Sequence, residues 1–157
     1  MKVLVFSDSH GRTGQMLSLI QAGKPDAVLH LGDHAGDVEE VRFAFPTLPC
    51  CAVSGNNDWG PEPMETVLEW EGVRMLCTHG HQLAVGRGPQ LLAARALQLE
   101  CRAALFGHTH RGFCQEVGGV LAFNPGSISL PRDGTNGSYG ILQLEQGRIR
   151  AQIIALE

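Results

Sequence analysis

The sequence predicts an α/β fold in which two β-sheets form one domain with α-helices on the outside. Roughly the first 55 residues alternate apolar strand-like runs with helical segments, which is typical of a parallel sheet. Much of the second half consists of short apolar or alternating segments joined by glycine-containing turns, which predict further strands. The chain has 157 residues, of which 43% are hydrophobic, enough for one domain with its own core. We therefore treat residues 1–157 as one domain.

The first strand is expected at residues 3–6, where four consecutive apolar side chains indicate burial on both faces. Asp8 and His10 follow it directly. Because side chains alternate along an extended chain, both can point to one side, just past the carboxyl end of the strand. Open α/β sheets bind ligands at that edge. An aspartate here is also common as a helix cap or turn residue, so this pair alone does not establish a site.

The next elements continue the alternation. They are a helix over about 13–21, a strand at 27–31, a helix over about 37–45 and a strand at 50–53. Thr13 is expected to cap the first helix and Gly23 to end it. Because parallel strands end at the same edge of a sheet, the polar residues after each strand are expected to lie close together.

The second half predicts a hairpin, one helix and several more strands. The expected elements are strands at 66–70 and 73–78, a helix at about 90–99, and strands at 102–106, 113–117, 120–123, 140–144 and 148–154. Leucine and alanine make the 90–99 segment the strongest helix of the chain. We expect the last four strands to form an antiparallel second sheet.

Charge and cysteine content exclude several classes of protein. The net charge of −4 gives no support for gripping a nucleic-acid backbone. No apolar run is long enough to span a membrane, and the N-terminal segment does not resemble a signal peptide. The five cysteines form no C-x-x-C pair. These features predict a cytoplasmic protein.

Polar clusters follow five of the predicted strands, and all seven histidines lie inside or just after strands. The clusters are Asp8-Ser-His10, Gly32-Asp33, Gly55-Asn56-Asn57-Asp58, His79 and Gly107-His108-Thr-His110. Carboxylate, imidazole and amide ligands without thiolate favour manganese, iron, zinc or nickel over calcium or magnesium alone. These candidate ligands exceed the needs of one ion, which predicts two ions sharing a carboxylate. Glycines before Asp33, Asn56 and His108 would let the backbone pass close to the metal or a phosphate.

Each cluster also has a purely structural interpretation. Asp33 and Asn56 are common turn residues, and His108 and His110 could be core histidines bonded to the backbone. Their joint occurrence at the strand ends of one sheet edge favours the metal site.

The ordered set Asp-x-His, Gly-Asp, Gly-Asn-x-Asp, His and Gly-His-x-His resembles the calcineurin-like metallophosphoesterase superfamily. The small size and the Asn124-Pro-Gly-Ser127 segment are similar to its compact bacterial and archaeal phosphodiesterase branch, the YfcE-like proteins. The resemblance covers residues 1 to about 131 and implies two mixed β-sheets flanked by helices, with a dinuclear site at one edge. It implies that one ion binds Asp8, His10 and His110, the other binds Asn56, His79 and His108, and Asp33 bridges both.

The function implied by this resemblance is a metal-dependent phosphodiesterase in which a metal-bridging hydroxide attacks phosphorus in line. Two divalent ions are expected, with manganese favoured and nickel, zinc or iron as alternatives. Many members carry a histidine where this chain has Asn57, and asparagine cannot act as a general acid. We therefore expect slow turnover of alkyl phosphates and faster turnover of aryl diesters. Asn57 is expected to hydrogen-bond the phosphate and Asp58 to orient a ligand.

Two other functions stay open: a phosphomonoesterase or nucleotidase of the same fold, and a non-catalytic protein-binding scaffold. The complete ligand set favours the enzyme. A homo-oligomer through the second sheet also stays open. Adjacent strand residues alternate faces, so His34 is expected to point away from the metals. The polar residues near the site without an assigned role are His34, His81, Arg12, Arg111 and Ser127.

Overall fold

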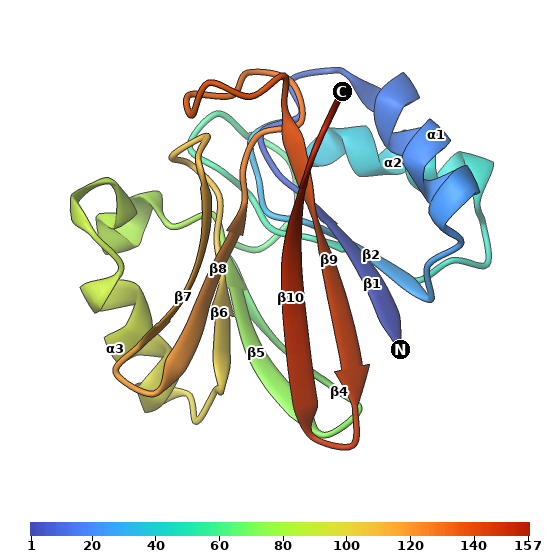
Figure 1. Ribbon diagram of the computed structural model, residues 1–157. Helices are drawn as coiled ribbons and strands as arrows, with labels where there is room; N and C mark the ends of the chain where they lie inside the picture. Colours follow the sequence, from blue (N-terminus) through green and yellow to red (C-terminus); the bar gives the residue numbers. More distant parts are fainter.

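The computed structural model describes residues 1–157 and has two mixed five-stranded sheets packed face to face (Figure 1). The first sheet has the order β10-β9-β1-β2-β3 and the second β4-β5-β6-β8-β7. The first contains β1 (Lys2–Phe6), β2 (Ala27–His30), β3 (Cys50–Ala52), β9 (Ser138–Glu145) and β10 (Arg148–Ala155). The second contains β4 (Glu65–Trp70), β5 (Val73–Thr78), β6 (Ala103–Leu105), β7 (Gly112–Val117) and β8 (Val120–Pro125).

Three α-helices cover the outer faces of the two sheets (Figure 1). They are α1 (Thr13–Gly23), α2 (Val38–Ala44) and α3 (Gln90–Gln98), with short 3₁₀ turns at η1 (Ala35–Asp37), η2 (His81–Leu83) and η3 (Val85–Arg87). Helices α1 and α2 pack on the first sheet through Met16, Ile20 and Val41. Helix α3 packs on the second sheet through Leu92 and Ala96. The predicted two-sheet fold with external helices is thus confirmed.

The side chains of β1 alternate between two cores. Val3 and Val5 lie in the core between the sheets, whereas Leu4 and Phe6 face α1 and α2. All four are at most 1% exposed. A strand buried on both faces has no position that tolerates a polar residue, which explains the uninterrupted apolar run.

The prediction that the last four strands form a sheet of their own is wrong. Strand β9 pairs antiparallel with β1 and carries β10 to the edge of the first sheet, while β8 pairs parallel with β6 in the second. Leu142 and Leu144 of β9 lie in the core between the sheets, with Val3 and Val5. The alternating pattern of β9 shows which face is buried but not which strand lies beside it.

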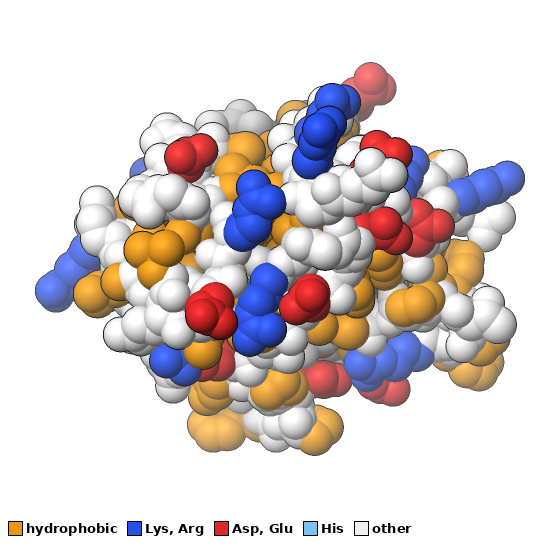
Figure 2. Space-filling model, turned by 90° about the horizontal axis from the view of Figure 1, so that it is seen from below, with side chains coloured by type: hydrophobic (Ala, Val, Ile, Leu, Met, Phe, Trp, Pro, Cys, Tyr) orange, Lys and Arg blue, Asp and Glu red, His pale blue; other side chains and the backbone are white.

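The carboxyl ends of the central strands lie at one edge of the two-sheet core. Strands β1, β2 and β3 are mutually parallel, as are β5, β6 and β8. The loops that follow these strands come together in the upper part of Figure 1. The opposite end carries lysines, arginines and acidic residues scattered among apolar side chains, with no histidine in view (Figure 2).

None of the three helices is long and apolar enough to cross a membrane.

The α1 boundaries correct two local expectations. Arg12, not Thr13, occupies the cap position, and it makes no side-chain cap bond. The helix includes Gly23, and Lys24 adopts the left-handed conformation that ends it.

Candidate metal centre

The predicted ligands lie on loops, directly after the strands. Five of them adopt left-handed backbone conformations, with φ between 45° and 68°: Asp8, His10, Asp33, His108 and His110. Such conformations are strained for residues with a side chain and cluster at functional sites. This corrects the reason for expecting Asp8 and His10 to converge. Strand β1 ends at Phe6, so the left-handed turns that follow it, not strand alternation, aim these side chains.

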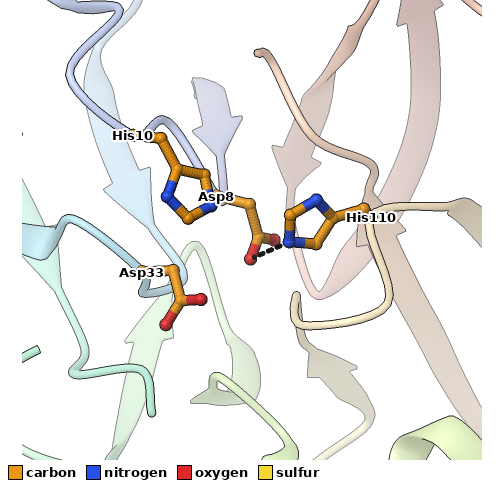
Figure 3. Close-up of side chains that lie close together, drawn as sticks. All are labelled: Asp8, His10, Asp33 and His110. Atoms are coloured by element: carbon orange, nitrogen blue, oxygen red, sulfur yellow. Dashed lines mark ion pairs between the residues drawn. The ribbon is translucent and has the colours of Figure 1, made fainter. Parts of the chain in front are cut away.

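Four of the predicted ligands form one group. One ligand atom each from Asp8, His10, Asp33 and His110 lies within 4.8 Å of the others (Figure 3). The residues come from three loops, following β1, β2 and β6. Asp8 and Asp33 are buried, at 0% and 3% exposure. Buried carboxylates facing imidazoles are a donor set suited to a transition metal.

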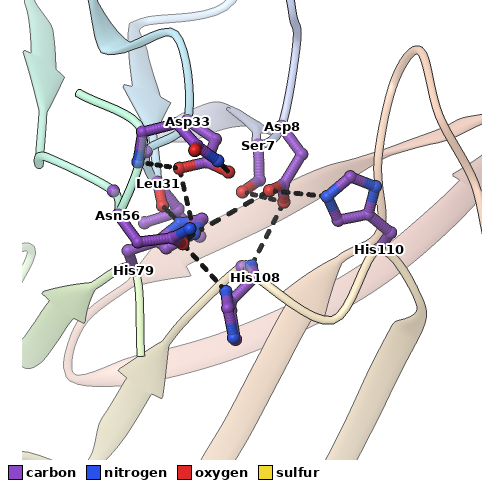
Figure 4. A network of polar contacts seen from close by, with 12 residues as sticks. Ser7, Asp8, Leu31, Asp33, Asn56, His79, His108 and His110 are labelled. Carbon is purple, nitrogen blue, oxygen red and sulfur yellow. Dashed lines mark hydrogen bonds and ion pairs between the residues drawn. The ribbon is translucent and has the colours of Figure 1, made fainter. Parts of the chain in front are cut away.

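The other three predicted ligands form an adjacent group around the Asn56 side chain (Figure 4). Oδ1 of Asn56 lies 3.1 Å from Nε2 of His79 and 3.0 Å from Nδ1 of His108. Nε2 of His79 also lies 3.4 Å from Oδ1 of Asp33 and 3.9 Å from Oδ1 of Asp8. The structure therefore brings all seven residues together, with the two aspartates between the groups.

Backbone carbonyls orient two of the imidazole rings. Nδ1 of His79 donates to the carbonyl of Leu31 at 2.7 Å, and Nδ1 of His110 donates to that of Leu130 at 2.7 Å. In the neutral ring, the opposite nitrogen, Nε2, then presents a lone pair to the aspartates. Histidines that bind metals through one nitrogen usually donate the other N–H in this way.

Two buried atoms in the first group have no hydrogen-bond partner: Oδ1 of Asp8 and Nε2 of His10. Nε2 of His110 lies 3.2 Å from that Asp8 oxygen. Burial raises the pKa of Asp8, but the His110 and His79 rings and the Ser7 hydroxyl outweigh it, so the pKa lies below its usual value. The same pairing with Asp8 raises the pKa of His110. Buried polar atoms are rarely unpaired, and a cation between them would satisfy both.

The rest of the Asp8 residue is tightly held. Oδ2 accepts from the Ser7 hydroxyl at 2.7 Å and the His108 N–H at 3.2 Å. The Asp8 carbonyl accepts from the hydroxyls of Ser127 and Ser129, both at 2.9 Å. Ser127 is fully buried, so it supports Asp8 and is not available for contact with a substrate. Of the polar atoms in the Asp8 side chain and carbonyl, only Oδ1 has no hydrogen-bond partner.

All three predicted glycines stand where a side chain would collide with the centre. A Cβ at Gly55 would lie 2.2 Å from Oδ1 of Asp33. A Cβ at Gly32 would lie 2.7 Å from Nδ1 of His79, and its φ of +94° also favours glycine. A Cβ at Gly107 would overlap the Ser7 hydroxyl and lie 3.0 Å from Oδ2 of Asp8. Close backbone approach, expected from the sequence, is present at all three positions.

Asn57 and Asp58 contact the loop that carries Asp33. The Asn57 side-chain amide donates to Oδ2 of Asp33 at 2.7 Å, and its backbone N–H donates to Oδ1 at 3.1 Å. Asp58 accepts backbone N–H bonds from His34, Ala35 and Gly55 at 2.7–3.0 Å. Asn57 thus holds a carboxylate in this structure, and Asp58 joins the two loops.

The unassigned histidines lie beside the centre. The His34 ring centroid is 5.1 Å from that of His10, and the His34 side chain is 48% exposed. His34 therefore does not point away as strand alternation suggested, because Asp33 and His34 both have positive φ beyond the end of β2. The His81 ring lies 5.5 Å from that of His79. Burial and the neighbouring His79 lower the pKa of His81.

Sequence reasoning missed three contributors: the carbonyls of Leu31 and Leu130, and the Ser129 hydroxyl. A backbone carbonyl leaves no signature in residue type. Ser129 stands two residues beyond the Asn-Pro-Gly-Ser turn, and that turn was the only available signal. Arg12 and Arg111 are both exposed, and Arg111 lines a pocket together with His108.

Both the sequence and the fold are similar to those of known proteins. A family model for the calcineurin-like phosphoesterase superfamily domain matches residues 1–147. Phosphodiesterase YfcE of Escherichia coli K12 is 38% identical over 167 aligned residues, covering 90% of this chain and 87% of YfcE. The crystal structure of a predicted phosphoesterase from Streptococcus pneumoniae TIGR4 superposes with a TM-score of 0.80 at 27% identity, covering 98% of this chain and 88% of that one.

A further solved structure shares the fold at lower identity. Vps29 of Entamoeba histolytica, crystallised with Zn²⁺, superposes with a TM-score of 0.77 at 21% identity and covers 99% of each chain. The family match over most of the chain and the 38% identity to YfcE establish the relationship. The chain belongs to the calcineurin-like phosphoesterase superfamily and is a metal-dependent phosphoesterase.

Proposed function

We propose that this protein is a phosphodiesterase that binds two divalent metal ions at the strand-end centre and hydrolyses a small phosphodiester. The observation that carries the proposal is a pair of buried, unpartnered atoms in a cluster of carboxylates and imidazoles. Oδ1 of Asp8 and Nε2 of His10 are buried without partners, and the Nε2 atoms of His79 and His110 face carboxylates. A cation bound among these groups would satisfy both unpartnered atoms and offset the charge of the carboxylates.

The two adjacent groups of side chains support two ions over one. Asp8, His10 and His110 would hold the first, and Asn56, His79 and His108 the second. Oδ1 of Asp33 lies 3.4 Å from Nε2 of His79, and Asp33 is also one of the four residues of the first group. This position between the two groups supports Asp33 as the bridging ligand. Manganese is the ion we favour for this mixture of oxygen and nitrogen ligands, with nickel, zinc and iron as alternatives.

When bound, a pair of divalent ions supplies hydroxide near neutral pH and neutralises phosphoryl charge during in-line displacement. The chain's own contribution is to fix the donors beforehand. Leu31 and Leu130 hold two rings, while Ser7, Ser127 and Ser129 hold Asp8. Preorganised charge of this kind needs no rearrangement as the reaction proceeds.

Asn57 cannot act as a general acid, and its side-chain amide donates a hydrogen bond to Asp33. Protonation of the leaving group by a side chain contributes about 10²–10⁴-fold in enzymes that have it. We therefore expect this enzyme to depend on the leaving group more than relatives with a histidine there. Aryl diesters should be hydrolysed faster than alkyl diesters.

The test is hydrolysis of bis-p-nitrophenyl phosphate and p-nitrophenyl phosphate by metal-stripped protein, with and without added manganese. We expect manganese-dependent turnover, with a higher kcat/KM for the diester. A higher value for the monoester would favour the phosphomonoesterase alternative. A folded protein without turnover in manganese, nickel, zinc or iron would contradict the proposal and favour a scaffold.

A further inference from the structure

A second pocket opens beside the metal centre and is lined entirely by polar residues and glycine. It measures about 350 Å³ and is bounded by Gly86, His108, Thr109, Arg111 and Arg132. His108 belongs to both places, since its ring also lies 3.0 Å from Oδ1 of Asn56. A phosphate held at the centre can therefore extend directly into this pocket.

The two arginines of the pocket have no acidic partner. The arginines that pair with carboxylates are Arg42, Arg74 and Arg95, which lie elsewhere. The adjacent carboxylate of Asp133 is committed to Gly112 and Thr135. Two unpaired guanidinium groups beside a phosphoesterase centre are suited to bind a further anion, because guanidinium matches the geometry of phosphate oxygens.

Arg132 is tied to the centre by its backbone. Its N–H donates to the carbonyl of His110 at 2.8 Å, while Leu130 accepts from the His110 ring. The segment that orients the His110 ring therefore also carries the positively charged Arg132.

Another pocket beside the centre is lined by acidic residues. It measures about 580 Å³ and is bounded by His34, Asn57 and Trp59 and by the carboxylates of Asp37, Glu39, Asp58 and Glu62. Arg42 pairs with Glu39 and Glu62 but does not line this pocket. The lining offers an anionic part of a substrate no arginine or lysine, so the arginine pocket is the more favourable of the two for an added phosphate.

We propose that Arg111 and Arg132, with His108 at its inner end, form a subsite for a second phosphate group carried by the substrate next to the phosphodiester. This inference rests on the proposed function and specifies its substrate class: a small diester with an additional phosphomonoester on the arm that enters the arginine pocket. The subsite binds this phosphate and takes no part in bond cleavage.

The experiment compares two substrates that share one leaving group. These are p-nitrophenyl hydroxyethyl phosphate and the same molecule with its hydroxyl phosphorylated. For the manganese-loaded protein we expect kcat/KM to be about tenfold higher with the second phosphate, the size of one good charge-assisted contact. The ratio of the two values should fall toward one in Arg111→Gln/Arg132→Gln and be largely retained in Arg111→Lys/Arg132→Lys.

Arg148→Gln is the matched control. Like the two pocket arginines, Arg148 is exposed and has no carboxylate partner. Unlike them, it lies far from the centre: it begins β10, and the preceding residue, Gly147, contacts the β4–β5 turn. The ratio should not change in this variant. The preference should also weaken with added salt, since both arginines are exposed.

Calorimetric binding of hydroxyethyl phosphate and of ethylene glycol bisphosphate provides a readout without turnover. We expect the bisphosphate to bind about tenfold more tightly, a preference lost in the double glutamine variant. Equal binding, or a ratio unaffected by the double variant, would overturn the subsite even if both diesters are hydrolysed. A preserved binding preference without hydrolysis would instead contradict the proposed function and support the subsite.

Discussion

Nε2 of His110 lies 3.2 Å from Oδ1 of Asp8, yet that carboxylate oxygen accepts no hydrogen bond. The proton of the neutral His110 ring is directed to the Leu130 carbonyl, so lone pairs of ring and carboxylate face each other. The contact is unfavourable for a neutral ring. It becomes favourable when the ring is protonated, which is why pairing with Asp8 raises the pKa of His110, or when a metal cation lies between the two atoms. Protonation of His110 and metal binding therefore compete at this pair.

Asp8→Asn tests this competition. The asparagine oxygen can still accept from Ser7 and the His108 N–H, while its amide can donate to His110. The surroundings of Asp8 hold its pKa below the usual value, so they favour the ionised carboxylate. Removing that charge should therefore destabilise the metal-free variant by about 1–3 kcal/mol. Thermal unfolding with and without manganese measures both states. We expect a lower metal-free Tm and no manganese-induced rise, and a metal-free Tm equal to or above that of the wild type would contradict this interpretation.

Gly55→Ala should destroy metal binding by displacing Asp33. The new methyl group would lie 2.2 Å from Oδ1 of Asp33, well inside van der Waals contact. Gly60→Ala, later in the same loop, is the control, because nothing lies within 4 Å of its Cβ position and its φ is not positive. Calorimetric titration with manganese should show binding in the Gly60 variant and none in the Gly55 variant. Equal affinities in the two would refute the close packing described here.

Asn57→Ala should weaken metal binding more than it weakens the fold. It removes a 2.7 Å bond to Asp33 from an exposed side chain. Loss of a group that orients a metal ligand typically costs about 10–100-fold in affinity or activity. We expect a loss of manganese affinity in that range, with little change in the Tm of the metal-free protein. An unchanged affinity would show that Asp33 needs no such support.

Asn57→His separates the role of Asn57 in holding Asp33 from the missing general acid. A histidine at this position can protonate a leaving oxygen. The variant should gain on alkyl diesters relative to aryl diesters, so that kcat/KM depends less steeply on the leaving-group pKa. The comparison uses a series of diesters at saturating manganese. A parallel loss on all substrates would indicate that only the contact with Asp33 matters.

His30 should make stability depend on pH. Burial lowers the pKa of this histidine from 6.5 to about 4. The ring is buried beneath Ser9, which bonds its Nε2 at 2.8 Å. At pH values between about 4 and 6.5, His30 is therefore protonated in the unfolded chain but not in the folded chain. The resulting stability is fully present above pH 6.5 and is lost as the pH falls to about 4.

The loss amounts to about 3 kcal/mol on account of His30 alone. The unfolding free energy, measured by urea unfolding at several pH values in this range, should change less with pH in His30→Gln than in the wild type. Identical slopes would mean that another group titrates.

Much of the fold was predictable because burial leaves a periodic pattern in the sequence. The apolar run of β1 indicated a strand buried on both faces, and the alternation with α1 and α2 indicated parallel neighbours. The position of β9 was not predictable in the same way. Its alternation shows a buried face, but its pairing with β1 depends on how Leu142 and Leu144 fill the core between the sheets.

The residue types of the centre were predictable, whereas its geometry was only partly so. Asp8 and His10 converge because both have positive φ after β1 has ended. Nothing in a run of residue letters specifies that conformation for non-glycine residues. The carbonyls of Leu31 and Leu130 were equally hidden, since every residue has a carbonyl. Whether a carbonyl orients a histidine depends on which ring the fold places opposite it.

The most direct test of the account is activity measured against bound manganese in metal-stripped protein. Hydrolysis of bis-p-nitrophenyl phosphate is followed while manganese is added in known equivalents and bound metal is counted. We predict no activity without metal and a rise that reaches its plateau at two ions per chain, abolished in Asp33→Asn. Full activity with one ion per chain, or activity that persists without metal, would contradict the proposed two-metal centre.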